Sequence, residues 1–144
     1  MDYDAISSAL RTKLEAVTLS PTMPFVWPNM NFKPETDGGE RGWLYGELSL
    51  HADEQSSFGN PTVGNYYRST GLFVVNVIVP RGDKIGRAEA LATAIRLHFK
   101  SESISGIHFT NRWIGSGRLN EQDSRWFALP VLMEFWADRL EAPA

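Results

Sequence analysis

The sequence predicts an α+β fold: a single domain in which two helices pack on one face of a mainly antiparallel or mixed sheet. Two segments carry apolar residues at the three- and four-residue spacing of a helix, and several others are apolar or alternating, as strands are. Most of the expected strands follow one another directly, which is typical of an antiparallel sheet. We expect one domain over residues 1–144, because this is the length of one ordinary domain.

The first helix is predicted over residues 3–17, where one stripe holds Tyr3, Ile6, Leu10, Leu14 and Val17. The next segment contains three prolines, which exclude a helix and a long central strand. We expect a short strand at 25–27, then an ordered turn, then a glycine-rich loop at 35–42.

A half-buried strand is predicted over residues 43–51, because Leu44, Leu48 and Leu50 share one face and polar or aromatic residues share the other. Residues 52–68 are polar and rich in glycine, so we expect a long loop there.

The best candidate for a central strand is residues 70–79, which are β-branched and nearly all apolar. A second helix is predicted over residues 84–100, with Ala88, Ile95 and Phe99 on its apolar stripe.

Two more strands are expected, at residues 104–114 and 126–137, joined by a polar connection. In the last strand, Phe127, Leu129, Val131, Met133 and Phe135 share one face. Pro130 lacks a backbone donor, so we expect this strand to be an edge or to carry a bulge.

Composition excludes several classes of protein. The formal net charge is −3 and the basic residues are scattered, which argues against a protein that grips DNA. The absence of cysteine excludes disulfides and thiolate metal sites. No apolar run approaches about 18 residues, so we expect no transmembrane helix. The acidic start of the chain differs from a signal peptide, so we expect the protein to act where it is made.

No recognisable catalytic motif is present, and we predict a non-enzyme without cofactor or metal. His51, His98 and His108 have no metal-ligand spacing, and the interpretation we favour is surface or hydrogen-bonded histidine. The Gly-Ser-Gly at 115–117 precedes polar loop residues rather than a helix, which excludes a dinucleotide fingerprint.

Large aromatic residues off the main apolar stripes are the candidate interface residues. On a sheet with helices on one side only, they would form an exposed patch, which usually marks a partner surface. Alternatively, a second layer from the long loops could cover them. The candidates, including those of the predicted 52–68 loop, are Trp43, Tyr45, Phe58, Tyr66, Tyr67, Trp126 and Trp136.

Three motifs, in this order, resemble those of a known family. They are VWPNMNFKP at residues 26–34, followed by Trp43-Leu44; the strand RSTGLFVVNVIVP at 68–80; and the alanine-rich helix GRAEALATAI at 86–95. In order and spacing over residues 3–137 they resemble phage tail terminator-like proteins. The loops at 35–42 and 52–68 match least.

The resemblance implies a structural role without catalytic residues. Such proteins bind as a ring, usually a hexamer, to the head-proximal end of the completed tail tube. They stop tube polymerisation and present a surface to head-completion or connector proteins. The implied location is the virion tail, after assembly in the bacterial host cytoplasm. A mildly acidic chain also suits a channel through which DNA slides without sequence-specific binding.

Two alternatives remain open from the sequence. One is another phage neck or tail-completion protein of similar fold. The other, from a different class, is a small hydrolase or ligand-binding domain with a pocket under the 52–68 loop. Converging titratable groups in a pocket would favour the second, and a flat aromatic patch would favour assembly.

Overall fold

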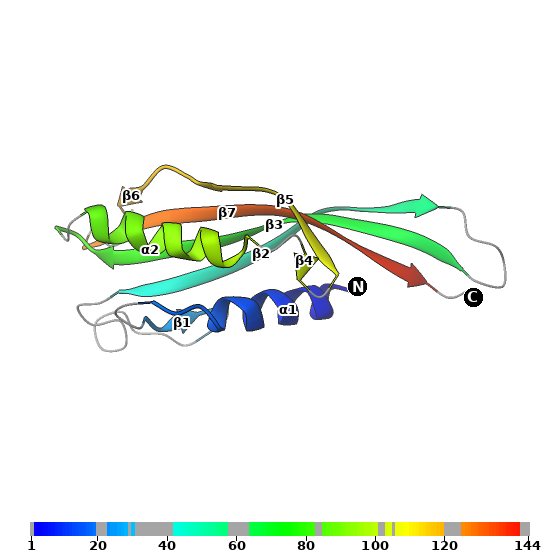
Figure 1. The fold of residues 1–144 in the computed structure, drawn as a ribbon, viewed down its shortest axis with the longest axis horizontal. Helices are drawn as coiled ribbons and strands as arrows, with labels where there is room; N and C mark the ends of the chain where they lie inside the picture. Colours follow the sequence, from blue (N-terminus) through cyan, green and yellow to red (C-terminus); the bar gives the residue numbers. More distant parts are fainter. Residues whose placement is uncertain are drawn as a thin grey trace.

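The computed structural model describes residues 2–19, 23–28, 30, 42–57, 64–82, 85–100, 103–104, 106–119 and 125–141. Within these ranges, two helices and seven strands are arranged along one elongated molecule (Figure 1). In chain order they are α1 (Tyr3–Glu15), β1 (Phe25–Val26), β2 (Trp43–Ser57), β3 (Asn65–Pro80), α2 (Ile85–His98), β4 (Ser103–Ile104), β5 (Ile107–Ile114), β6 (Arg118–Leu119) and β7 (Trp126–Glu141).

All the strands belong to one sheet. Six of them follow the order β1-β2-β3-β7-β5-β4, and the short β6 pairs with β7 off this path. Only β1 and β2 are parallel. The predicted fold class, α+β with a mainly antiparallel mixed sheet, is therefore confirmed.

Both helices form where the apolar spacing predicted them. The Asp2 carboxylate caps α1 by accepting a hydrogen bond of 2.9 Å from the Ala5 N–H, which satisfies one of the free donors of the first turn. Ile6, Leu10 and Leu14 are fully buried along the stripe. Each helix ends two residues before the predicted boundary.

The main core lies between the helices and the sheet. It contains the buried stripes of α1 and α2 together with alternate residues of β3 and β7, which lie on one face of each strand. From β3 these are Phe73, Val75, Val77 and Val79, and from β7 they are Leu129, Val131, Met133, Phe135 and Ala137.

Three strands continue well beyond the helices and form what we call the arm: residues 52–57 of β2, 65–70 of β3 and 136–141 of β7 (Figure 1). The predicted loop at 52–68 is therefore wrong for most of its length. These segments pair residue by residue, with two register shifts in β2. In the part of the chain that the structure describes, no helix packs against the arm (Figure 1). Its strands therefore carry no apolar stripe, and the sequence pattern did not reveal them. Residues 58–63, and the predicted loop at 35–41, lie outside the described residues.

Pro130 occupies an inner strand, which makes the prediction of an edge or a bulge at this residue wrong. It pairs with Asn76 of β3, and its carbonyl accepts a hydrogen bond of 2.9 Å from the Gly115 N–H. The N–H and C=O of one strand residue point to the same side. The missing donor of Pro130 therefore faces Gly115, just beyond the end of β5.

Candidate assembly surface

Two of the predicted interface tryptophans are buried within the chain. Trp43 is 6% exposed and Trp126 is 7% exposed, and their rings meet edge to face with centroids 4.6 Å apart. They form a second, smaller apolar cluster with Val26, against which Tyr45 and Ile78 pack. Trp43 and Trp126 therefore pack against each other and against Val26 of β1 within the chain. A covering layer from the long loops stays a prediction.

Trp136 is half-buried at the base of the arm, in a stack of three side chains. Its ring lies parallel to that of His108 with centroids 4.1 Å apart, and the Arg68 guanidinium carbon lies 3.8 Å from its centroid on the indole. Arg68 is also fixed by Asp138, with two donated hydrogen bonds of 2.9 and 3.1 Å. Tryptophan and arginine held in this way are typical of the residues that carry binding energy at interfaces.

The opposite face of the arm carries a second polar network. Arg139 donates to both carboxylate oxygens of Asp53, at 2.5 and 2.7 Å, and lies 5.0 Å from the centre of the Tyr67 ring. Asp53 also accepts a hydrogen bond of 3.1 Å from the Ser69 hydroxyl. Strand alternation places Tyr67 and Ser69 on the face opposite Arg68, so each face of the arm has its own ion pair.

These pairs stabilise the ionised carboxylates. The hydrogen bond from Arg68 lowers the pKa of Asp138, and the hydrogen bond from Arg139 lowers the pKa of Asp53. Burial acts in the other direction on both groups and is the weaker effect. The arm is therefore held by charges as well as by its backbone ladder.

The remaining candidates differ in accessibility. Tyr66 is 45% exposed on the arm, while Tyr67 is half-buried beneath Arg139. Phe58 lies outside the described residues. Participation of these aromatic residues in an interface stays a prediction.

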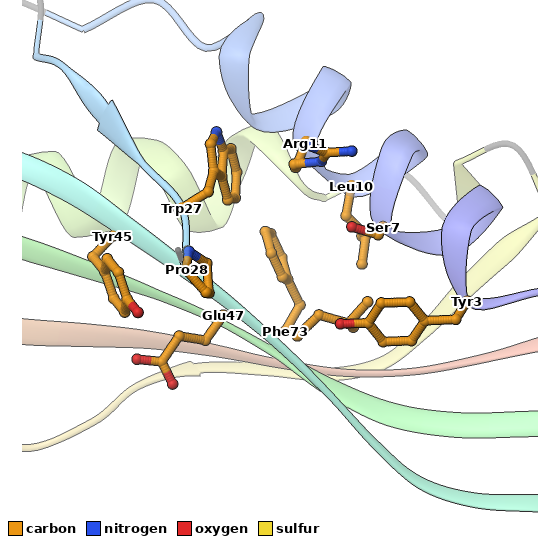
Figure 2. A pocket seen from close by; sticks show the side chains of 11 residues that line it. Tyr3, Ser7, Leu10, Arg11, Trp27, Pro28, Tyr45, Glu47 and Phe73 are labelled. Atoms are coloured by element: carbon orange, nitrogen blue, oxygen red, sulfur yellow. The ribbon is translucent and has the colours of Figure 1, made fainter. Parts of the chain in front are cut away.

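A groove of about 450 Å³ lies along the outer side of β2, between α1 and the segment that follows β1 (Figure 2). Leu10 and Phe73 form its apolar floor, and Arg11 and Glu47 lie on its rim. Trp27 is held over Gly46 by donating to the Glu15 carboxylate at 3.3 Å. The groove is not under the 52–68 segment, where the sequence placed the pocket of a hydrolase.

The phenol of Tyr45 also lines the groove. Burial, and after it the negative charge of Glu47, raises the pKa of Tyr45, so this phenol stays protonated at neutral pH. Among the described residues, no group of three or more His, Asp or Glu is placed to hold a metal ion. Nor is any helix in the described ranges long and apolar enough to cross a membrane.

The predictions from sequence missed the charged residues of the arm. Asp53, Arg68, Asp138 and Arg139 are distant in sequence, and only the strand register brings the members of each pair together. The polar side chains of residues 52–57 and 65–70 were the available signal for these strands. A solvated loop has a similarly polar sequence.

Comparison with known proteins places the chain in a family. The model of the phage tail terminator protein family matches residues 5–135. No curated protein matches. One solved structure, of a protein without a functional name, is similar in fold over 98% of each chain, with 22% sequence identity and a TM-score of 0.65. The chain therefore belongs to the family of phage tail terminator proteins, structural components that complete the tail of a phage virion.

Proposed function

We propose that this protein closes as a hexameric ring on the head-proximal end of the tail tube. The ring stops tube polymerisation and presents a joining surface to a head-completion or connector protein. The family match over residues 5–135 is the observation that carries the proposal, because it covers nearly the whole fold rather than one motif.

The shape of the molecule supports this role. A ring is built from heterologous contacts, so each copy needs two different complementary patches. In our proposal the chain is a single domain whose helices cover one face of the sheet. The sheet edges, the other face and the arm are then left to reach neighbouring copies and the tube.

The charge of the chain suits the proposed channel. With a formal net charge of −3, the ring would carry no excess of positive charge to trap phosphates. DNA would therefore pass through it without sequence-specific binding. Assembly in the bacterial host cytoplasm, ahead of incorporation into the virion, belongs to the same proposal.

The test is to mix the purified protein with purified tail-tube protein and to image the tube ends. We expect an added ring at one end of each tube. A matched pair of variants sharpens the result. Trp136→Ala removes the aromatic centre of the stack at the base of the arm, whereas Leu97→Ala changes an equally apolar side chain on α2 that is 51% exposed.

We expect capping to weaken with Trp136→Ala and to be unchanged with Leu97→Ala. Bare tube ends with the wild-type protein would contradict the proposed function. A ring found on the head or neck instead of the tube would favour another tail-completion role.

A further inference from the structure

We propose that neighbouring copies in the ring join edge to edge: the outer edge of β2 in one copy pairs with the outer edge of β5 in the next, so that one sheet continues from copy to copy. This inference rests on the proposed ring and names the contact that closes it. In Figure 1, β2 and β5 lie on opposite sides of β3 and β7.

The outer edge of β2 is open over most of its length. In the part of the chain that the structure describes, β1 pairs only with Leu44 and Tyr45, whereas β2 continues to Ser57. The Leu44 N–H points outward, where it donates to the Pro24 carbonyl at 2.9 Å. Every second residue points to the same side, so Leu48, which lies beyond the residues paired with β1, also presents its backbone groups outward. An open edge of this kind is a template for another strand.

The outer edge of β5 is open in the same way. Within the described ranges, β4 pairs only with Ile107 and His108, and β5 continues to Ile114. The Gly115 N–H points inward to Pro130, so alternation directs the backbone groups of Arg112 and Ile114 outward. The two edges therefore offer free donors and acceptors at opposite sides of one sheet.

Strand direction is compatible with this pairing. β2 is antiparallel to β3, β3 to β7 and β7 to β5, so β2 and β5 run in opposite directions. In a ring whose axis lies along the strands, rotation leaves the direction of each strand along the axis unchanged. The β5 strand of the next copy then meets β2 antiparallel, and the same contact repeats until the ring closes.

The charges of the two edges are complementary. Besides Asp53, which is paired with Arg139 of the same chain, β2 carries Glu47 and Glu54, and it contains no Lys or Arg. Residues 107–119, which include β5 and β6, contain no Asp or Glu; they carry Arg118 and also Arg112, whose guanidinium donates to the Phe99 carbonyl of the same chain. Opposite charges favour the β2–β5 contact, whereas pairing β2 with a second β2 would bring like charges together.

The groove beside β2 lies where the added strand would run. Its lining includes Gly46, Glu47 and Leu48 of the open edge. A neighbouring strand would form the missing wall of the groove and cover its apolar floor.

Crosslinking through introduced cysteines tests the contact, because the chain has no cysteine of its own. A variant with Ser49→Cys on β2 and Thr110→Cys on β5 places one exposed thiol at each edge. In a second variant, Asn111→Cys takes the place of Thr110→Cys. It detects a contact in which the two strands are shifted by one residue. After treatment of capped tubes with a short bis-maleimide, we expect a ladder of bands up to the hexamer. A control pair on the exposed sides of the helices, Ser8→Cys with Thr93→Cys, should give no ladder.

Charge reversal provides a second measurement. The double variant Glu47→Lys, Glu54→Lys should raise the concentration needed to cap half of the tubes by about tenfold, as expected when complementary charges are made repulsive. Glu89→Lys, an exposed change of the same kind on α2, should leave that concentration unchanged.

The outcomes separate this inference from the proposed function. Capped tubes without a ladder from either cysteine pair would overturn the edge contact and leave the capping role intact. Dimers formed by Ser49→Cys alone would overturn it in favour of a two-fold contact. A ladder in concentrated solution, together with bare tube ends, would support the edge contact and contradict the capping role.

Discussion

Two regions of the molecule, the arm and the region that carries the helices, share three continuous strands. They are stabilised in different ways. Between the helices and the sheet, β3 and β7 bury alternate apolar residues in a core that both helices help to form. In the arm, the same strands carry the Arg68–Asp138 pair on one face and the Arg139–Asp53 pair on the other. We call the region that carries the helices, residues 3–15, 43–50, 71–82, 85–100, 107–119 and 126–135, the body.

This difference predicts different responses to mutation and to solvent. Apolar contacts neither titrate nor undergo charge screening, whereas exposed ion pairs are weakened by both acid and salt. The body should therefore set the global stability of the protein, and the arm should open locally at a lower cost.

The largest effects are expected from truncations in the core of the body. Ile95 and Val77 are fully buried there, on α2 and β3. Ile95→Ala and Val77→Ala should each lower the free energy of unfolding by about 1–4 kcal/mol, measured by urea denaturation. Unchanged midpoints in both variants would contradict the assignment of this core.

A smaller effect is expected where β2 meets Trp27. A methyl group on Gly46 would lie 2.2 Å from Cζ3 of Trp27, so Gly46→Ala must displace that ring. We expect a loss of about 1–3 kcal/mol, with a change in tryptophan fluorescence. Gly86→Ala on α2 is the control, since nothing lies within 4 Å of its new methyl group. This variant should be neutral or slightly stabilising; equal destabilisation by both would contradict the packing of Trp27 on β2.

Acid should open the arm before the body. Arg68 lowers the pKa of Asp138, and Arg139 lowers that of Asp53. A carboxyl group whose pKa is lower in the folded state stabilises that state above its unfolded pKa, and this stabilisation is lost as the pH falls through the folded pKa. Lowering the pH from about 5 to below the usual aspartate range, near 3.9, should reduce the protection of backbone amides against hydrogen exchange more at residues 65–70 and 136–141 than at residues 72–79, after correction for the intrinsic exchange rate at each pH. An equal loss of protection in both segments would show that the arm does not depend on these pairs.

The smallest effect should come from removing one charge of the arm. Asp53→Asn leaves the backbone ladder intact, and the Asp53 side chain is 46% exposed. The substitution should change the global midpoint of thermal unfolding by no more than high salt changes that of the wild-type protein. The reason is that exposed ion pairs contribute little to global stability. Hydrogen exchange in the arm should nevertheless increase. A large fall in the midpoint would mean that the arm is part of the same cooperative unit as the body.

Much of the body could be predicted from the sequence, because burial on one face produces a periodic pattern. The stripes of Leu10 and Ile95 predicted the two helices, and the β-branched run around Val77 predicted the central strand. The predicted ends of the strands were wrong where that pattern ended. β2 and β3 extend through segments whose side chains are polar on both faces.

The candidate surface was harder to predict for a related reason. Trp43 and Trp126 are distant in sequence, and their contact depends on the strand order β2-β3-β7. The position of Trp126 within an apolar cluster also makes its replacement a poor probe of assembly, since the variant would lose packing within the chain. Trp136, half-buried between Arg68 and His108, is the better probe.

The most direct test of the capping role is the length of tail tubes polymerised in the presence of increasing amounts of this protein. If the protein terminates tubes, the mean length should fall as its concentration rises, and each shortened tube should carry one ring at one end. A length distribution that is the same with and without the protein, under conditions in which the protein is folded, would contradict the proposed function.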